Sequence, residues 1–250
     1  MKSFLLAFQF LTIIPLWNQE KTTEQDMGRA VAFFPLIGIV QGAILYALAR
    51  CCEKIFPYEL TACLVVFLLY LISGGLHIDG LTDTFDGLAA THHNREKRLA
   101  IMKDSASGPI GVLALVMIVL LKWIALKTLL AVGSIEAVVI MPVLGKWAMV
   151  PTIFSGKPAR QDSIGRVFMD NVGYIELLAA SGIAGVICAT LGGLITGLGV
   201  MFSVYCVSLG LRVFFTGRFG GLTGDSLGAV CEIAEAGSLV LYIAILSVIS

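Results

Sequence analysis

Long apolar stretches separated by shorter polar connections make up most of the chain. A transmembrane helix needs about 20 mostly apolar residues to cross the hydrocarbon core of a bilayer. A glycine-rich run, GGLITGLG, divides the longest apolar stretch into two. We therefore predict seven membrane spans, the last of them short: 30–50, 58–76, 108–131, 134–154, 175–195, 197–215 and 236–250.

The N-terminal segment MKSFLLAFQFLTIIPLW, residues 1–17, resembles a secretory signal in having one lysine followed by an apolar run. It lacks a small-residue cleavage site, Pro15 interrupts it, and it is too short to span a bilayer. We predict a retained interfacial or re-entrant helix. The expected fold is an all-α transmembrane bundle of six or seven spans plus this helix, forming one integral membrane domain over residues 1–250.

Composition supports this fold class. The 250 residues are 58% hydrophobic and only 14% charged, and the mean hydropathy is +0.92. A soluble domain has about 25% charged residues, so this chain has too little polar surface to be covered by water. The net charge is zero and no basic tail is present, so nothing indicates a nucleic-acid partner; the lipid bilayer is the expected environment.

Lysine and arginine are distributed unevenly between the predicted connections. With seven spans, the N-terminal region and the loops 77–107, 155–174 and 216–235 lie on one side of the membrane. That side holds twelve of the 17 Lys and Arg residues, whereas only Arg50 and Lys54 lie on the other. Cytoplasmic loops carry an excess of these residues, so we predict that the side rich in basic residues faces the cytoplasm.

The first polar motif is GGLHIDGLTDTFDGLAA, residues 74–90, which contains three aspartates and no Lys or Arg. Asp79, Asp83 and Asp86 are four and three residues apart, so on a helix they share one face and repel one another. A multivalent cation would reverse that repulsion, and oxygen-only ligands favour Mg²⁺ or Mn²⁺ over zinc. The four glycines of the motif are expected to let a ligand approach the backbone. The alternative is a solvated acidic loop.

Basic side chains follow in the same loop, within REKRLAIMKDSASGPIGVLAL at 95–115. Arg98 and Lys103 lie near the aspartates in sequence, and Asp104 adds another carboxylate. Cations beside a carboxylate–metal cluster are typical of phosphoryl transfer, where both share the phosphate charge. Simple anchoring of the chain at the cytoplasmic face is the alternative for Arg98.

A third motif, GRFGGLTGDSLGAVCEIAEAG at 217–237, combines glycines, Arg218 and three acids. Asp225, Glu232 and Glu235 are seven and three residues apart, which places them on one face of a helix. Acids at the start of a membrane helix are costly and usually functional. A favourable helix dipole could explain Asp225 alone.

Two further elements are candidates for the site. The polar loop SGKPARQDSIGRVF, residues 155–168, brings Arg160 to the predicted cytoplasmic side, where it could cap a substrate site or be solvated. His77 lies within reach of the aspartates and could act with them or pack at the membrane interface.

A run of small residues at 179–199 would permit close helix contacts, including those of a homo-oligomer.

The three motifs GGLHIDGLTDTFDGL, EKRLAIMKDSASGPIGVLAL and GRFGGLTGDSLGAVCEIAE resemble those of the adenosylcobinamide-GDP ribazoletransferases, also called cobalamin (5'-phosphate) synthases. The N-terminal stretches FLLAFQFLTIIPL and AVAFFPLIGIVQGAIL are similar to the opening of that family, so the resemblance covers nearly the whole chain. It implies a Mg²⁺-dependent, multi-pass enzyme of the cell inner membrane with its active site facing the cytoplasm.

The implied reaction belongs to the nucleotide-loop assembly of cobalamin biosynthesis. Adenosylcobinamide-GDP reacts with alpha-ribazole or its 5'-phosphate, GMP is released, and adenosylcobalamin or its 5'-phosphate forms. We expect the ribazole 5'-hydroxyl to attack the phosphorus nearest cobinamide. Asp225 or Glu232 would complete the metal site or accept the hydroxyl proton, and His77 would assist. The expected Mg²⁺ ligands are Asp79, Asp83, Asp86 and Asp104, and the expected phosphate-binding residues are Arg98, Lys103, Arg160 and Arg218.

Three alternatives stay open. DTFDG, residues 83–87, resembles the opening of the CDP-alcohol phosphotransferase signature, although the rest of that signature is absent. A polyprenyl transferase also combines aspartates, Mg²⁺ and diphosphate, but it would have two aspartate-rich motifs. A cation-coupled transporter would distribute its acids through the membrane interior, whereas the acids here are predicted to gather at one face.

Overall fold

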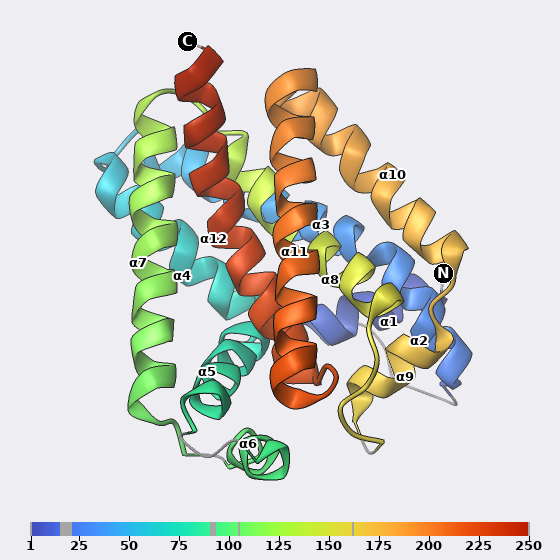
Figure 1. Cartoon of the computed structure of the whole chain (residues 1–250). Helices are drawn as coiled ribbons and strands as arrows, with labels where there is room; N and C mark the ends of the chain where they lie inside the picture. Colours follow the sequence, from blue (N-terminus) through green and yellow to red (C-terminus); the bar gives the residue numbers. More distant parts are fainter. Residues whose placement is uncertain (1, 16–21, 91–93, 105, 162, 250) are drawn as a thin grey trace.

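The computed structural model of the chain describes residues 2–15, 22–90, 94–104, 106–161 and 163–249, and these residues are almost entirely helical (Figure 1). Residues 1, 16 and 17 of the predicted N-terminal segment, residue 250 of the last predicted span, and Lys21 in the count of basic residues lie outside them. The helices are α1 (Lys2–Leu11), α2 (Glu24–Ala30), η1 (Val31–Phe33), α3 (Phe34–Cys52), α4 (Tyr58–Ser73), α5 (Leu76–Ala89), α6 (Arg95–Ile101), α7 (Pro109–Ala131), α8 (Ala137–Ser155), α9 (Ile164–Asn171), α10 (Tyr174–Leu191), η2 (Gly193–Gly197), α11 (Leu198–Phe219) and α12 (Gly224–Ile249).

The predicted number of spans is confirmed. Among the described residues, six helical segments are long and apolar enough to cross a membrane, and a seventh is added if α4 and α5 form one broken span. The six segments are Glu24–Cys52, Pro109–Ala131, Ala137–Ser155, Tyr174–Leu191, Gly193–Phe219 and Gly224–Ile249. Helix α1 has only 10 residues and does not reach spanning length, as expected for the N-terminal segment.

The predicted start of the last span was wrong. Helix α12 begins at Gly224 and runs for 26 residues, so Asp225, Glu232 and Glu235 lie inside it rather than in a preceding loop. The break predicted at 192–199 is confirmed, because the π-helical turn η2 separates α10 from α11. Part of the small-residue run serves contacts within the chain, since Gly197 packs directly on the backbone of Cys188.

A sharp bend between α4 and α5 sets the position of the acidic motif. The two helices meet at 90°, and the bend is made by Gly74 and Gly75, whose φ angles are +63° and +72°. This left-handed conformation is easily adopted only by glycine and is a common way to end a helix. These two glycines therefore turn the chain between α4 and α5, a role that the sequence did not predict.

The connections predicted to share one side of the membrane lie together. Figure 1 shows α6, α9, the end of α5 and the turn between α11 and α12 at the lower end of the bundle. The connection between α7 and α8, the turn between α10 and α11, and the C-terminal end of α12 lie at the upper end.

Helix α8 is the centre of the bundle and is buried along nearly its whole length. It lies against α3 and α12, the two helices with which it has its most extensive contacts. Close approach to α3 depends on Gly38 and Gly42, since a Cβ atom on either would lie within 2.8 Å of α8 backbone atoms. Small residues four apart are a common device for bringing membrane helices together.

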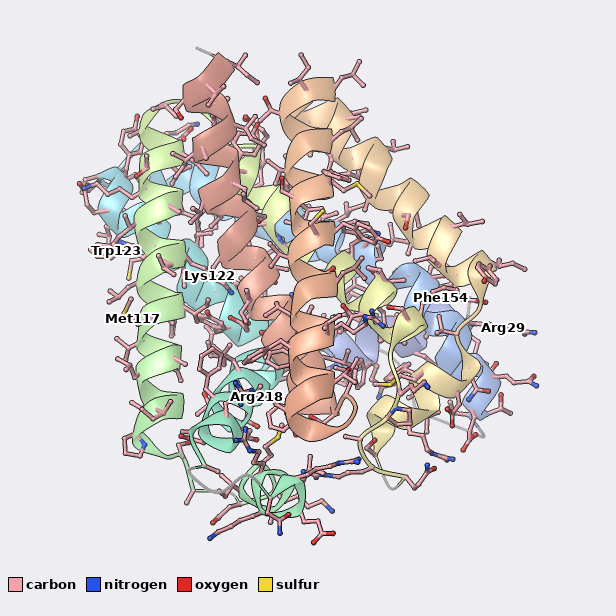
Figure 2. The ribbon with its side chains drawn as sticks, in the orientation of Figure 1. Arg29, Met117, Lys122, Trp123, Phe154 and Arg218 are labelled. Carbon is pink, nitrogen blue, oxygen red and sulfur yellow. The ribbon has the colours of Figure 1, made fainter. Side chains whose placement is uncertain are left out.

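A network of four buried charges joins α7, α8 and α12. Lys122 Nζ on α7 lies 2.7 Å from Glu232 and 2.5 Å from Glu235 of α12, and Lys146 Nζ on α8 lies 2.6 Å from Glu235. The Tyr70 hydroxyl of α4 donates to Glu232 at 3.0 Å. Figure 2 shows Lys122 pointing into the bundle, whereas Met117 and Trp123 of the same helix point outward. Two cations and two anions balance one another in the interior.

Charge balance in this network predicts a specific pattern of stabilities. Removing one partner of a buried ion pair costs about 3–5 kcal/mol, because the other charge is left uncompensated. We expect Lys146→Met and Glu235→Gln each to lower the thermal unfolding midpoint in detergent. The double variant keeps the neutral pair of Lys122 and Glu232, so it should be less destabilised than the sum of the single variants. Strictly additive losses would contradict the network.

Candidate active site

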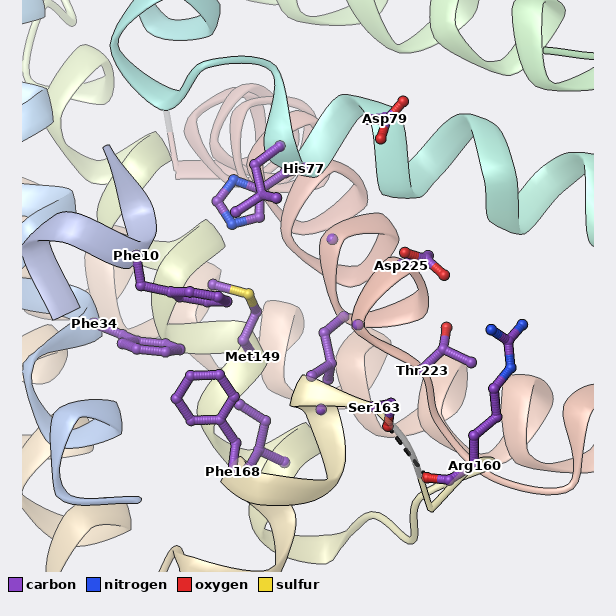
Figure 3. A pocket seen from close by; sticks show the side chains of 16 residues that line it. Phe10, Phe34, His77, Asp79, Met149, Arg160, Ser163, Phe168, Thr223 and Asp225 are labelled. Carbon is purple, nitrogen blue, oxygen red and sulfur yellow. Dashed lines mark hydrogen bonds between the residues drawn. The ribbon is translucent and has the colours of Figure 1, made fainter. Parts of the chain in front are cut away.

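A cavity of about 310 Å³ opens between α5, α8, α9 and the start of α12. Its lining changes character from one end to the other (Figure 3). Phe10, Phe34, Phe168 and Met149 surround one end, and Asp79, Thr223, Asp225 and Arg160 lie at the other. The cavity therefore offers an apolar chamber and a charged mouth to the same ligand.

The acidic motif of α5 meets the start of α12 at this mouth. A Cβ atom on Gly80 would lie 2.8 Å from the carbonyl oxygen of Asp225, and one on Gly228 would lie 3.1 Å from the carbonyl oxygen of His77. Both glycines allow the two helices to cross at close range. This crossing places Asp79 and Asp225, one residue from each of two sequence motifs, on the lining of one cavity.

The carboxylates at the mouth differ in their partners. Asp83, one turn after Asp79, is half-buried and is repelled by the charges of Asp79, Asp86 and Asp225. Within the described residues, no hydrogen bond or ion pair reaches the carboxylate of Asp79 or Asp83. Asp225 lies near the Thr223 hydroxyl and is attracted by the positive charge of Arg160. The α5 carboxylates are thus uncompensated, whereas Asp225 is partly compensated.

Arg160 is the single Lys or Arg among the described residues that line the cavity. Its guanidinium donates to the carbonyl oxygen of Leu99 in the α6 region, and Figure 3 shows the side chain reaching toward Asp225 and Thr223. The loop after α8 therefore delivers a cation to the acidic mouth, as the sequence allowed. Ser163, which donates to the Arg160 carbonyl oxygen at 3.2 Å, lines the same end.

The donor set fits Mg²⁺ held jointly with a phosphorylated ligand. Among the described residues, no three acidic, histidine or cysteine side chains are arranged to hold an ion by themselves. Mg²⁺ is usually bound through one or two carboxylates together with substrate phosphates and water, and not by an all-protein cage. Two unpaired, oxygen-only side chains, Asp79 and Asp83, match that requirement.

Asp86 has a different environment from the one predicted. Its carboxylate accepts the backbone N–H groups of Gly108 at 2.6 Å and Gly111 at 2.7 Å. These donors belong to the first turn of α7, where backbone N–H groups have no partner inside the helix. Gly111 also allows this contact sterically, since a Cβ atom there would lie 2.6 Å from the Thr82 carbonyl oxygen. Asp86 therefore caps α7, a role that the sequence did not predict, and its role as a Mg²⁺ ligand stays a prediction.

Asp83 and Asp86 do not line the cavity, and four other predicted residues also lie outside its lining. Asp104 is exposed and accepts the Ala106 N–H at 3.2 Å in the turn after α6. Lys103 is its exposed neighbour, and Arg98 is buried under α5. Arg218 is exposed and lies over the Phe214 ring at 5.3 Å. All four belong to the same end of the bundle as the cavity, but none of them lines it.

Glu232 and His77 also differ from expectation. Glu232 is 2% exposed and belongs to the buried charge network, about 10 Å along α12 from Asp225 at 1.5 Å per residue. The shared helix face predicted for the two acids therefore spans separate environments. His77 lines the cavity, but its ring faces the apolar chamber near Phe10 and not the carboxylates (Figure 3).

Sequence reasoning missed two groups of residues. The partners of the buried glutamates, Lys122 and Lys146, were visible as lysines in the middle of apolar spans, where an unpaired charge is costly. The apolar chamber combines Phe10, Phe34 and Phe168 from α1, α3 and α9. No spacing rule connects three phenylalanines so far apart in sequence, and each looks like an ordinary core residue.

Comparison with known proteins agrees with these observations. Residues 3–243 match the family model described as cobalamin-5-phosphate synthase. An adenosylcobinamide-GDP ribazoletransferase of Pseudomonas fluorescens is 35% identical over 96% of this chain and 98% of its own length. Proteins of the same name from Acetivibrio thermocellus and Pseudomonas aeruginosa are each 36% identical, over 97% and 96% of this chain and 97% of their own lengths.

No solved structure matches the chain, so the family assignment depends on sequence similarity. The family match covers nearly the whole chain. It includes α5, α12 and the loop after α8, which together form the charged mouth. The chain belongs to the cobalamin-5-phosphate synthase family.

Proposed function

We propose that this chain is an adenosylcobinamide-GDP ribazoletransferase. It transfers the adenosylcobinamide-phosphate group of adenosylcobinamide-GDP to alpha-ribazole or its 5'-phosphate and releases GMP. One observation supports the assignment to this site: Asp79 lies with Asp225 and Arg160 on the lining of one cavity, and Asp83 follows one turn later on α5, close enough to be repelled by Asp79 and Asp225. The names of the relatives support the choice of substrates.

The attacking group is a ring hydroxyl of the ribose and not the 5'-hydroxyl expected from the sequence. A product that keeps its 5'-phosphate, as the family description states, has its 5' oxygen already esterified. A ring hydroxyl oxygen forms a bond to the phosphorus nearest cobinamide, the bond from that phosphorus to the bridging oxygen breaks, and GMP leaves. The hydroxyl proton passes to a base.

Asp225 is the base in this proposal. It lines the cavity, is half-buried, and lies at the point where the chamber meets the charged mouth. A general base must lie within hydrogen-bonding reach of the proton that it removes. The positive charge of Arg160 attracts its carboxylate. Glu232 has no part in this step because Lys122 and Tyr70 already hold it.

Asp79 and Asp83 would hold Mg²⁺ together with the diphosphate of the GDP arm. When bound, the ion supplies positive charge that stabilises the transferring phosphoryl group. Arg160 binds a phosphate oxygen from the opposite side of the mouth. Arg98, Lys103 and Arg218 lie farther out at the same end, where their charges attract the anionic substrate.

The alternatives receive less support. A cation-coupled transporter would use interior acids, and the structure does contain two, contrary to the expectation that all acids gather at one face. Both Glu232 and Glu235 are neutralised by lysines, however, and neither lines the cavity. A CDP-alcohol phosphotransferase or a polyprenyl transferase has no counterpart among the relatives described above, which share the ribazoletransferase name.

The proposed Mg²⁺ site predicts the effect of one conservative substitution in α5. Membranes containing the wild-type chain should release GMP from adenosylcobinamide-GDP, alpha-ribazole and Mg²⁺, and chelation of the metal should stop the release. Asp83→Asn should lower kcat/KM by at least about 100-fold, as loss of one charge-stabilising group typically does. Its unfolding temperature should not fall below the wild-type value, since the change relieves repulsion between carboxylates. The exposed Glu96→Gln is the matched control, and full activity of Asp83→Asn would exclude the proposed role.

Substitution of Asp86 should lower stability more than activity, which is the reverse of the pattern expected for Asp83→Asn. Asp86→Ala removes a cap from α7, and such losses cost about 0.5–2 kcal/mol. We expect a lower unfolding temperature with GMP release reduced much less than in Asp83→Asn, and partial recovery of stability in Asp86→Asn, which keeps one acceptor oxygen. An Asp86→Asn protein of normal stability that is as inactive as Asp83→Asn would show instead that Asp86 is a metal ligand.

The bundle end that carries the site is proposed to face the cytoplasm in the cell inner membrane. The excess of Lys and Arg on that side supports this orientation. In a cysteine-free background, Lys97→Cys on α6 should resist a membrane-impermeant maleimide added to spheroplasts, whereas Lys54→Cys should react. Both side chains are exposed, so lysis should make both reactive. The reverse labelling pattern would invert the orientation.

A further inference from the structure

We propose that the apolar chamber of the cavity is the binding site for the aromatic base of ribazole, with His77 as its hydrogen-bonding partner. The assignment rests on the proposed function, which supplies the identity of the nucleophile but says nothing about where its base lies. A flat, uncharged base carrying a ribose has one apolar end and one polar end. The cavity has the same polarity along its length.

The walls of the chamber have the chemistry of a site for an aromatic ring. Phe10, Phe34 and Phe168 form a cluster with ring centroids 5.0–6.2 Å apart. Phe10 and Phe34 are nearly parallel, at 16°, and Phe168 stands steeply to Phe34, at 73°. Met149 adds a polarisable thioether, which adapts to aromatic ligands. The base of alpha-ribazole, a benzimidazole with two methyl groups, is planar and apolar enough to pack there.

His77 provides the independent sign that a ligand belongs in the chamber. Its side chain is 3% exposed, and neither ring nitrogen has a hydrogen-bonding partner within the described residues. Buried polar groups are nearly always hydrogen-bonded, so an unpartnered one requires a specific explanation. The benzimidazole nitrogen that does not carry the ribose has a lone pair and accepts one hydrogen bond. An N–H of the His77 ring can donate it.

The volume of the cavity indicates which of the two substrates it can enclose. A cavity of about 310 Å³ lies at the lower end of the range of about 300–1,000 Å³ for small-molecule sites. It suits a nucleoside and is too small for the corrin macrocycle, which must stay outside the mouth. With the base in the chamber, the ribose lies between Ser163 and Thr223 and its ring hydroxyls face Asp225. The nucleophile thus reaches the diphosphate from the interior side.

Binding of the base alone tests the chamber without catalysis. The purified protein in detergent, without Mg²⁺ or adenosylcobinamide-GDP, should bind 5,6-dimethylbenzimidazole in a saturation-transfer NMR or equilibrium dialysis measurement. Phe168→Trp, which fills the chamber, should weaken binding at least tenfold, and the exposed Phe202→Ala on α11 should leave it unchanged. Absence of binding to the wild type, or equal binding by Phe168→Trp, would overturn the proposal.

A substrate analogue tests the role of His77. An alpha-riboside of 5,6-dimethylindole has a C–H in place of the accepting nitrogen, and we expect its KM with the wild type to be about tenfold higher than that of alpha-ribazole. In His77→Phe the two KM values should become equal, and His77→Gln, which keeps an N–H donor, should restore part of the difference. KM for adenosylcobinamide-GDP should change less than twofold. Unaltered discrimination in His77→Phe would exclude His77 as the partner.

The two proposals fail separately. If wild-type membranes release no GMP but the purified protein binds the base and Phe168→Trp does not, the chamber is supported and the ribazoletransferase assignment is wrong. If GMP is released normally and Phe168→Trp leaves both base binding and the KM for alpha-ribazole unchanged, the enzyme assignment stands and the chamber is not the base site.

Discussion

The buried ion pairs of Lys122 and Lys146 with Glu232 and Glu235 are the constraint on which the rest of the bundle depends. An unpaired charge inside a membrane protein is expensive, so α7, α8 and α12 must keep the depth and rotation at which all four charges meet. Gly145 of α8 leaves room for the Glu235 side chain, since a Cβ atom there would lie 3.0 Å from its carboxyl carbon. With α12 fixed in this way, its first turn is held against α5.

The active site follows from that crossing. Glycines at the contact let α5 and α12 approach so closely that two short polar segments, each at the end of an apolar helix, share one cavity mouth. The acidic residues of α12 thus have two different roles. Asp225 lies at the mouth and acts on substrate in our proposal, whereas Glu232 and Glu235, two to three turns deeper, stabilise the bundle.

The spans and part of the site could be predicted from the sequence, but several tertiary contacts could not. Hydropathy located the spans because the lipid-facing helices must be apolar, and the motifs identified the family and the meeting of Asp79 with Asp225. Periodicity could not separate Asp225 from Glu232, because a common helix face does not imply a common environment. It could not show that Asp86 caps α7, since the partner N–H groups lie more than 20 residues away. Aromatic residues of α1, α3 and α9 converge only through tertiary packing.

The most direct measurement is pulsed electron paramagnetic resonance of Mn²⁺ bound in place of Mg²⁺, in the presence of adenosylcobinamide-GDP. If the α5 carboxylates hold an ion on the diphosphate, the wild-type spectrum will contain ³¹P hyperfine couplings that are lost in Asp79→Asn/Asp83→Asn and retained in Asp86→Asn. Couplings that persist unchanged in the Asp79→Asn/Asp83→Asn protein would contradict the central role given to this acidic mouth.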